Sequence, residues 1–360
     1  MDAITTEQAA APLPLRYGFR FEGSGGEFFK IWIVNLALTV VTLGVFSAWA
    51  KVRNTRYFYG NTYIGDHNFD YHADPVRILI GRIIALVALI AYSVASAFAP
   101  LLSFVFFIAL LIATPWLIIS ALRFNARNSS YRNIRFGFDA EYSEAARVYL
   151  LWPLFAFVTL FTTYPLARRA QLHFNINHHS FGGKPFDCEI AGKAIYKVFF
   201  KGLILYFAGA FAILMMVFLF NFGTMFADMA PDQPAPPGAF AAMMLLSISV
   251  MGVFLVVTTY VATEVFNLAL TQTTLALRYS FESTLSSLTV IWLLVSNLAL
   301  ILVTLGLFYP WARVRVAQYT ASCLAVTGPA DMDGFTSELV AGQGAIGEEI
   351  ASFFDVDVSL

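Results

Sequence analysis

The feature that most constrains this chain is a series of seven apolar runs, each long enough to cross a membrane. They lie at about 31–50, 78–99, 101–122, 148–167, 202–222, 240–262 and 288–309. A transmembrane helix needs about 20 apolar residues. Only 12% of the 360 residues are charged, against about 25% in soluble domains. The pattern predicts a polytopic membrane protein and excludes a soluble enzyme or a disordered chain.

The cysteine content and the net charge exclude further classes of protein. Cys188 and Cys323 are far apart and have no zinc or disulfide spacing, so we expect neither a metal finger nor a disulfide framework. A net charge of −1 lacks the basic footprint that nucleic-acid binding requires. Residues 1–27 are polar and lack the pattern of a secretory signal.

The seven runs divide into pairs and lone segments. The runs at 78–122 are separated only by Ala99-Pro100, and those at 202–262 by a Pro- and Gly-rich stretch at 223–239. We therefore expect two transmembrane hairpins, at 78–122 and 202–262. The remaining lone segments are 29–50, 148–167 and 288–309.

A long motif is repeated at the two ends of the chain. Residues 42–53 read Thr-Leu-Gly-Val-Phe-Ser-Ala-Trp-Ala-Lys-Val-Arg, and residues 304–315 read Thr-Leu-Gly-Leu-Phe-Tyr-Pro-Trp-Ala-Arg-Val-Arg. A degenerate middle copy, 160–169, keeps the Ala167-Arg168 step but has lost the Gly and the Trp. Such self-similarity indicates internal repeats.

A second repeat predicts short strands. Asn61, Asn128, His178 and Thr271 each stand eight residues before an aromatic residue, and a further aromatic residue or cysteine follows two positions later. Alternation of this kind is typical of a half-buried strand, and Phe19-x-Phe21 is a candidate fifth strand. The predicted fold is an α-helical polytopic membrane protein with internal repeats, two transmembrane hairpins, three lone segments and short cytoplasmic β-strand motifs.

These repeats suggest a division of the chain. We expect a polar N-terminal segment at 1–27, a first repeat at 28–147, a second at 148–287, a partial third at 288–327 and an acidic C-terminal tail at 328–360.

The basic residues bear on whether the lone segments cross the membrane. If all seven segments cross, 10 of the 22 Lys and Arg residues lie on one side and 12 on the other, whereas the positive-inside rule expects a clear bias. If the lone segments instead dip in and return, all 22 share the cytoplasmic side with both termini. We favour re-entrant segments, with turns near Gly44 and Gly306. A plain crossing of 20 apolar residues remains the alternative.

The repeats also single out candidate binding residues, because polar side chains recur at equal positions in both full copies. Paired basic residues suit anionic headgroups or an anionic substrate, and buried Asn and Thr suit a transporter site. The structural alternatives are snorkelling, interfacial anchoring by Trp and helix–helix hydrogen bonds. The candidates are Asn35, Thr42, Trp49, Lys51, Arg53, Asn297, Thr304, Trp311, Arg313 and Arg315.

The long motif, followed by Arg56-Tyr57 and Asn61-Thr62, resembles the YjgN family of bacterial inner-membrane proteins, and the acidic tail ending at Asp357 is similar to that family's C-terminus. The resemblance covers nearly the whole chain. It implies a multi-pass protein of the bacterial inner membrane with unknown function, and it brings no catalytic residues. The middle copy departs from the pattern, which puts in doubt any role that needs three equivalent segments.

The sequence contains no recognisable catalytic motif. No H-E-x-x-H, G-x-S-x-G or phosphate-binding loop occurs. His173, His178 and His179 could converge on a metal, but His178 stands where sister copies have Asn61 and Asn128, which indicates a structural role. We expect no enzyme, no metal and no cofactor.

The most favoured function is therefore binding or transport of a small or lipid-like molecule, anionic ones included, at the repeat interface. The alternative is a scaffold that organises the cytoplasmic leaflet or partner proteins. Expected partners are membrane lipids, with anionic headgroups favoured, and a protein partner or second copy of the chain.

Overall fold

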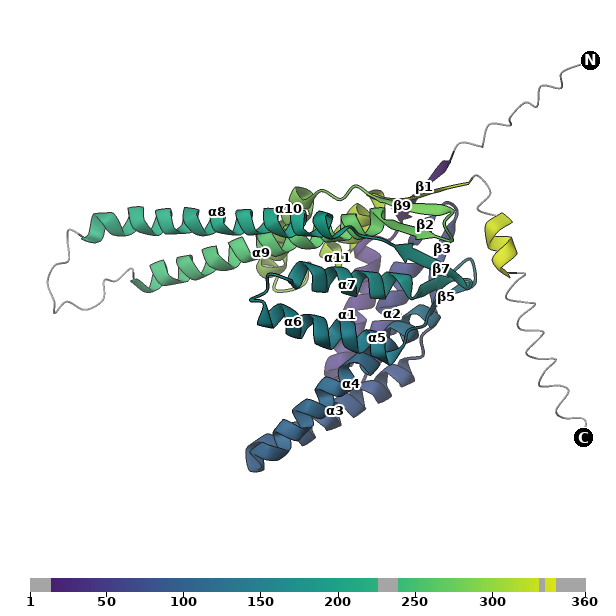
Figure 1. Ribbon diagram of the computed structural model, residues 1–360, viewed down its shortest axis with the longest axis horizontal. Coiled ribbons are helices and arrows are strands. Elements are labelled where there is room, and N and C mark those ends of the chain that lie inside the picture. The colour runs from purple at the N-terminus through teal and green to yellow at the C-terminus, as the bar shows by residue number, and fades with distance from the viewer. Residues whose placement is uncertain (1–13, 226–238, 330–333, 341–360) are drawn as a thin grey trace, which may run out of the picture.

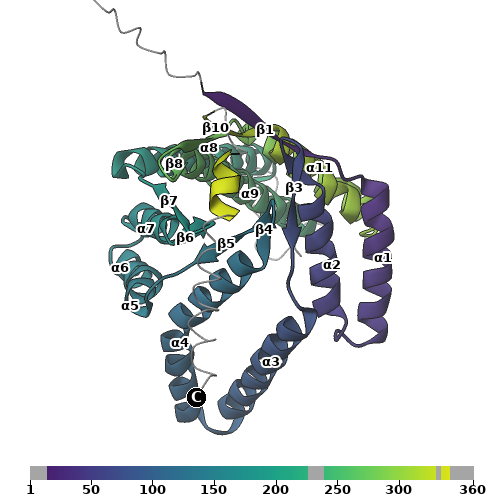
Figure 2. The ribbon, with the colours of Figure 1, turned by 90° about the vertical axis from the view of Figure 1, so that its right-hand side faces the viewer.

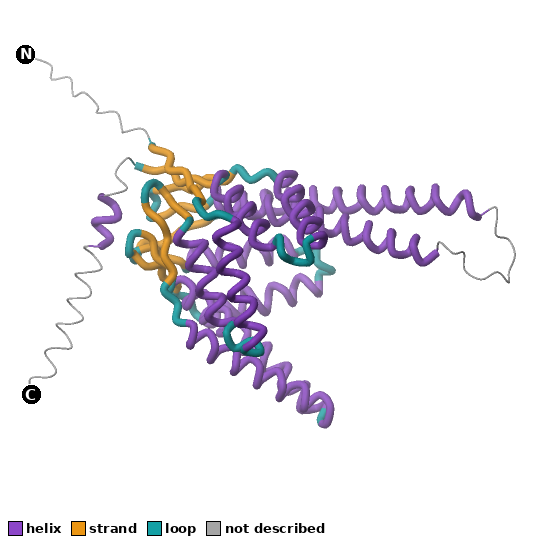
Figure 3. Tube along the Cα trace, turned by 180° about the vertical axis from the view of Figure 1, so that it is seen from behind, coloured by secondary structure: helices purple, strands orange, loops and turns teal. Residues whose placement is uncertain are grey.

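A ten-stranded barrel lies at one end of the molecule and helices extend away from it (Figures 1 and 3). The computed structural model describes residues 14–225, 239–329 and 334–340. About half of the predicted N-terminal segment at 1–27 and most of the acidic tail at 328–360 therefore lie outside the described residues.

Every strand of the barrel is short, and neighbouring strands are antiparallel. Around the ring the order is β1, β10, β9, β8, β7, β6, β5, β4, β3, β2 and back to β1. The strands are β1 (Leu15–Phe21), β2 (Thr62–Ile64), β3 (His67–Tyr71), β4 (Ser129–Tyr131), β5 (Ile134–Phe138), β6 (His179–Phe181), β7 (Lys184–Cys188), β8 (Thr273–Leu275), β9 (Tyr279–Ser283) and β10 (Leu324–Gly328).

The predicted fold class is wrong, because the strands form a closed barrel and the protein is not a purely α-helical membrane protein. The motifs at 61–71, 128–138, 178–188 and 271–281 do form strands, as does Phe19-x-Phe21. An isolated two-stranded hairpin is marginally stable and leaves unpaired edges. The first part of β1 pairs with β10 and its second part with β2, so the two ends of the chain close the ring and remove every edge.

The helices join consecutive β-hairpins. They are α1 (Gly25–Val41), α2 (Ser47–Gly60), α3 (Pro75–Phe98), α4 (Pro100–Arg127), α5 (Tyr142–Ala146), α6 (Trp152–Val158), α7 (Tyr164–Asn177), α8 (Gly192–Met225), α9 (Ala239–Thr271), α10 (Ser287–Val303) and α11 (Tyr309–Ser322), with a π-helical turn η1 (Arg147–Leu151) between α5 and α6. The predicted repeat boundaries stay a prediction.

The two predicted hairpins correspond to α3–α4 and α8–α9. These four helices are long and apolar enough to span a membrane, so the chain is a membrane protein. In α8–α9 the helices approach closely at glycines: a Cβ on Gly202 would lie 2.6 Å from Val261 and one on Gly209 2.7 Å from Val253.

Each lone segment forms a helix that ends at a tight turn, after which the chain returns beside it. The three pairs are α1 with α2, the α5–η1–α6 segment with α7, and α10 with α11. Their turns expose a leucine in the left-handed conformation, Leu43, Leu160 or Leu305, with 95%, 84% and 93% of the residue surface accessible. We call these residues the tip leucines.

The repeated spacing of the strand motifs has a structural cause at the helix ends. The side chains of Asn61, Asn128, His178 and Thr271 each bond the backbone carbonyl four residues earlier in the preceding helix. These bonds satisfy carbonyls that a helix end leaves open. His178 therefore has the structural role of Asn61 and Asn128, as the sequence indicates.

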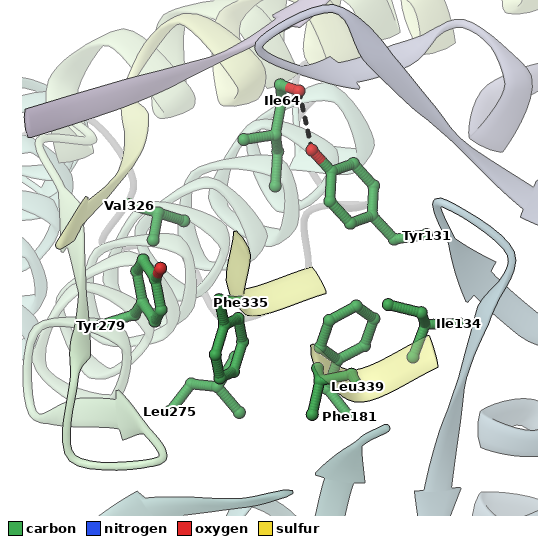
Figure 4. Packing of buried hydrophobic residues seen from close by; sticks show 9 residues of the cluster. All are labelled: Ile64, Tyr131, Ile134, Phe181, Leu275, Tyr279, Val326, Phe335 and Leu339. Carbon is green, nitrogen blue, oxygen red and sulfur yellow. Dashed lines mark hydrogen bonds between the residues drawn. The ribbon is translucent and has the colours of Figure 1, made fainter. Parts of the chain in front are cut away.

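The barrel interior is an apolar core. Nine buried residues form it: Ile64, Tyr131, Ile134, Phe181, Leu275, Tyr279, Val326, Phe335 and Leu339 (Figure 4). The last two belong to a helical segment, 334–340, that lies across the end of the barrel (Figures 1 and 2). The core thus joins the C-terminal part of the chain to the barrel.

Candidate functional site

The buried amide of the first copy bonds within its own helical pair. Asn35 on α1 is 2% exposed. Its Oδ1 accepts a hydrogen bond from Arg53 Nη1 at 3.0 Å, and its Nδ2 donates to Asn54 Oδ1 at 2.9 Å. These bonds tie α1 to α2.

The last copy repeats this arrangement. Asn297 on α10 is 5% exposed. Its Oδ1 accepts from Arg315 Nη1 at 2.6 Å, and its Nδ2 donates to the carbonyl of Ala312 at 3.4 Å. Buried polar groups need partners, and these four candidates find them in one another, as helix–helix hydrogen bonds.

Thr42 and Thr304 lie at the turns. Each hydroxyl donates to the carbonyl four residues earlier, Leu38 or Leu300, at 2.7 Å. Each oxygen also accepts the amide four residues later, of Phe46 or Phe308, at 2.9 and 3.0 Å. One hydroxyl thus serves the backbone on both sides of the turn.

The other candidates lie on α2 and α11. Trp49 stacks on Phe46 at 6.1 Å and Trp311 on Phe308 at 6.0 Å between ring centroids. Lys51 is exposed. The guanidinium carbon of Arg313 lies 5.1 Å from the centroid of the Phe58 ring.

Closure of the barrel brings the two full copies side by side. α1 packs against α11, with Phe29 and Trp311 5.1 Å apart and Trp32 and Tyr309 6.0 Å apart between ring centroids. Trp311 also covers Gly25, where a Cβ would lie 2.2 Å from the indole. The copies meet through aromatic rings, while each Asn–Arg pair stays inside its own helical pair.

Two of the ten candidates line a cavity. Asn297 and Arg313 belong to the wall of a space of about 830 Å³ between α9, α10 and α11. This cavity lies at the predicted boundary between the second and third repeats. A ligand-binding role for the ten candidates stays a prediction.

A larger cavity of about 1200 Å³ lies on the other side of α9, and we call it the main cavity. Helices α7, α8 and α9 form its walls, and β5, β6, β7, β8 and β9 contribute residues at the barrel end. The two cavities share Thr258, Ala262 and Phe266 on α9. The lining of the main cavity is mostly apolar and aromatic, as is usual for small-molecule sites.

One face of α7 supplies the arginine and an amide to the wall of the main cavity. Arg168, Leu172, Asn175 and Ile176 recur at helical spacing along this face, and His179 follows at the start of β6. Arg168 Nη1 donates to Gln171 Oε1 at 3.2 Å. Among the described residues no carboxylate lies within 4.0 Å of the Arg168 guanidinium.

His179 adds no positive charge. Burial lowers the pKa of His179, and the neighbouring His178 lowers it further, while the hydrogen bond to the Asn175 carbonyl raises it. The imidazole is therefore neutral at physiological pH. Arg168 is the cation of the main cavity among the described residues that line it.

Sequence reasoning missed Arg168 as a site residue, although a signal for it was present. Arg168 occupies in the middle copy the position of Lys51 and Arg313, and Arg313 lines the smaller cavity. The aromatic lining residues Phe136, Phe186 and Phe281 were recognised only as strand residues.

The histidine cluster lies beside a third cavity of about 380 Å³ between η1 and α7. Its groups bond to protein partners: His178 Nε2 lies 2.7 Å from Glu144 Oε2, and His173 Nε2 accepts the Ile190 amide at 2.9 Å. No group of three residues suited to a metal occurs in the part of the chain that the structure describes.

Comparisons with known proteins agree with a membrane role. The chain is similar to the inner membrane protein YjgN of Salmonella typhimurium (strain LT2), with 25% identity over 88% of this chain and 90% of the relative. Inner membrane proteins YjgN of Escherichia coli O157:H7 and strain K12 are 26% and 29% identical over 44% and 34% of this chain, and 40% and 31% of those proteins. No solved structure matches. Residues 16–353 match the family described as bacterial protein of unknown function, DUF898, and the chain belongs to this YjgN-like family of membrane proteins.

Proposed function

We propose that this protein binds a lipid-like molecule with an anionic group in the main cavity between α7, α8 and α9. The observation that carries the proposal is a cavity of about 1200 Å³ with a mostly apolar lining and Arg168 in its wall. Such a space suits an acyl chain, and a guanidinium without a carboxylate partner suits a carboxylate or phosphate.

The repeat supports the same chemistry on the other side of α9. Arg313 has the repeat position of Arg168 and lines the smaller cavity with Asn297. Each cavity thus combines one arginine of the repeated motif with apolar helix faces.

Binding is tested with a fluorescent single-chain acid, 11-(dansylamino)undecanoic acid, added to the protein in phosphatidylcholine nanodiscs. We expect Arg168→Gln to weaken binding about 10- to 100-fold, since a hydrogen bond to a charged group contributes about 1.5–3 kcal/mol. Arg168→Lys should retain part of the affinity. Thr258→Trp should abolish binding, because Thr258 lines both cavities.

Lys197→Gln on α8 is the matched control, since Lys197 is exposed near the same cavity but does not line it. The methyl ester of the probe should bind the wild type as weakly as the acid binds Arg168→Gln. Equal affinity of acid and ester for the wild type, or equal affinity of Arg168→Gln and Lys197→Gln for the acid, would contradict the proposal.

Movement of the ligand across the bilayer is a separate measurement. In liposomes with a fluorescent anionic phospholipid, dithionite bleaching reports exchange between leaflets. If the protein transports the lipid, exchange should exceed that of protein-free liposomes and fall about tenfold in Arg168→Gln. Exchange at the protein-free rate would restrict the function to binding.

The second candidate function is a scaffold that inserts into one leaflet, and the tip leucines favour it. These three leucines are almost fully exposed at the ends of apolar helical pairs, and exposed apolar surface of this kind suits lipid contact. If this is the main role, replacing the tip leucines by Asp should release partners or alter vesicle shape while probe binding stays intact.

A further inference from the structure

Five phenylalanines follow one another around the inside of the barrel, from β1 to β9. They are Phe19, Phe69, Phe136, Phe186 and Phe281, one each from β1, β3, β5, β7 and β9. Successive ring centroids from Phe19 to Phe281 are 6.3, 6.5, 6.4 and 5.9 Å apart. We call this set the phenylalanine ring.

The phenylalanine ring lies between the core of the barrel and the main cavity. All five residues pack against the buried core that contains Phe335 and Leu339, and Phe136, Phe186 and Phe281 also line the main cavity. His179 and Thr273, at the helix-side ends of β6 and β8, line the cavity as well. Phe136, Phe186 and Phe281 therefore lie between the core of the barrel and the main cavity.

The helical segment 334–340 lies over the end of the barrel that faces away from the helices, and its side chains pack against the core (Figures 1 and 4). Phe335 and Leu339 point inward and are 7% and 3% exposed. The Phe335 ring lies 5.0 Å from that of Tyr279 between centroids. We call this segment the stopper.

Polar contacts hold the stopper to the turns of the β-hairpins. Arg132 Nη1, in the β4–β5 turn, donates to Thr336 Oγ1 at 2.9 Å. Arg278, after β8, lies 3.9 Å from Glu338, and both side chains are about 60% exposed. Solvent screening makes such an exposed pair weak.

The stopper is short enough to leave the barrel. Seven residues form two helical turns, and helices below about 12 residues are marginal on their own. The segment therefore gains its order from two buried apolar side chains and a few polar contacts. The strands do not need it for their ladder, because each strand is already paired on both sides.

We propose that the barrel is a gated passage to the main cavity, in which the phenylalanine ring is the constriction and residues 334–340 are a removable stopper. The passage admits the acyl chain of an amphiphile, since its wall is apolar and aromatic. The identity of this ligand rests on the proposed function. The opening of the barrel can be measured without any ligand.

A disulfide can lock the stopper. A Cβ on Gly182 would lie 3.1 Å from the Leu339 Cβ, and a disulfide needs about 3.8 Å. Gly182 has φ +56°, but Arg132 has φ +52° in the equivalent turn, so this backbone accepts a side chain. The variant Gly182→Cys/Leu339→Cys is made with Cys188→Ser and Cys323→Ser. Gly182→Cys alone is its control.

Uptake of 11-(dansylamino)undecanoic acid from water is followed by stopped-flow fluorescence in nanodiscs. We expect uptake to be at least tenfold slower in the oxidised double variant, and reductant to restore it. The single variant should be insensitive to reductant. Equal uptake by the oxidised and reduced double variant would overturn the passage.

A second measurement needs no ligand. Thr273→Cys lies on the cavity side of the phenylalanine ring. It is labelled with a charged, membrane-impermeant methanethiosulfonate in the same cysteine-free background. Phe335→Asp/Leu339→Asp should release the stopper and accelerate labelling at least tenfold. Asp66→Cys lies in an exposed turn. It should be labelled at the same rate whether the stopper is native or carries Phe335→Asp/Leu339→Asp.

The two measurements separate the two proposals. If labelling of Thr273→Cys rises but no variant binds the probe, the passage stands and the proposed ligand is wrong. If the probe binds and labelling stays unchanged on release of the stopper, the binding function stands and the passage is overturned.

Discussion

At the residue scale, the repeated Asn and Arg residues act as pairs that hold helices together. Asn35–Arg53 and Asn297–Arg315 have the same geometry in two copies. The middle copy has Trp152 and Ala170 at the corresponding positions and joins its helices through Tyr149 and Asn175 at 2.6 Å instead. The pairs therefore belong to the architecture of the full copies.

This role predicts a measurable coupling between Asn297 and Arg315. Asn297→Leu should lower the free energy of unfolding by about 1–3 kcal/mol, since Arg315 loses its acceptor in a half-buried place. The double variant Asn297→Leu/Arg315→Leu should cost less than the sum of the single variants. Unfolding in detergent, followed by circular dichroism, measures all three.

Arg77→Leu is the control, because the Arg77 side chain is 77% exposed, and it should change stability little. Strict additivity of the two single variants would show that the bond contributes nothing. A double variant with normal stability but no probe binding would instead assign the pair to the ligand.

Repetition in the sequence identified these residues, but it could not tell which partner each takes. The bond between Asn35 and Arg53 depends on where the chain turns, and that turn is set by Thr42 and Gly44. Arg168 was not predicted as a site residue, because the middle copy has lost the Trp that marks the motif in the two full copies. Its place beside the main cavity follows from packing between helices distant in sequence.

At the element scale, the Thr-Leu-Gly sequence forms a tight turn between two helices. Gly44 N bonds the Thr39 carbonyl at 2.8 Å, and Gly306 N bonds that of Ile301 at 2.7 Å. Such bonds close a helix with a left-handed residue after its cap. Here that residue is a leucine, Leu43 or Leu305, which places an apolar side chain at the extreme end.

We therefore expect the tip leucines to lie in the hydrocarbon of the membrane. A nitroxide attached to Leu43→Cys or Leu305→Cys should relax strongly with oxygen and weakly with a water-soluble nickel complex in electron paramagnetic resonance. A nitroxide at Asp66→Cys, in the β2–β3 turn, should show the reverse. Strong relaxation of both tip labels by the nickel complex would place the tips in water and contradict re-entrant insertion.

At the scale of the whole molecule, local signals predicted the parts and long-range pairing decided the fold. Aromatic residues at every second position predicted the strands, and the long apolar runs predicted the hairpins α3–α4 and α8–α9. Closure depends on Leu15 pairing with Gly328 and Phe21 with Thr62, contacts with no local sequence signature. The same closure sets α1 against α11 and creates the interior that Phe335 and Leu339 fill.

A closed barrel also fixes the sidedness of the chain, because all ten strands must lie on one side of the membrane. No Lys or Arg occurs between 83 and 122 or between 202 and 277, the regions of the two long hairpins. The positive-inside rule then predicts that the barrel lies in the cytoplasm. Cysteines at Asp66 and Asn133, in the β2–β3 and β4–β5 turns, should react with an impermeant maleimide only in inside-out vesicles.

Phe98→Cys, at the exposed end of α3, should react only in right-side-out vesicles. Sealed vesicles of both orientations, checked with a soluble cytoplasmic marker, make the comparison quantitative. The decisive pair is Asp66 and Asn133, because the hairpin α3–α4 lies between them and returns the chain to the same side. If one reacted from each side, an odd number of crossings would separate β3 from β4, and these strands could not pair as Phe69 with Tyr131.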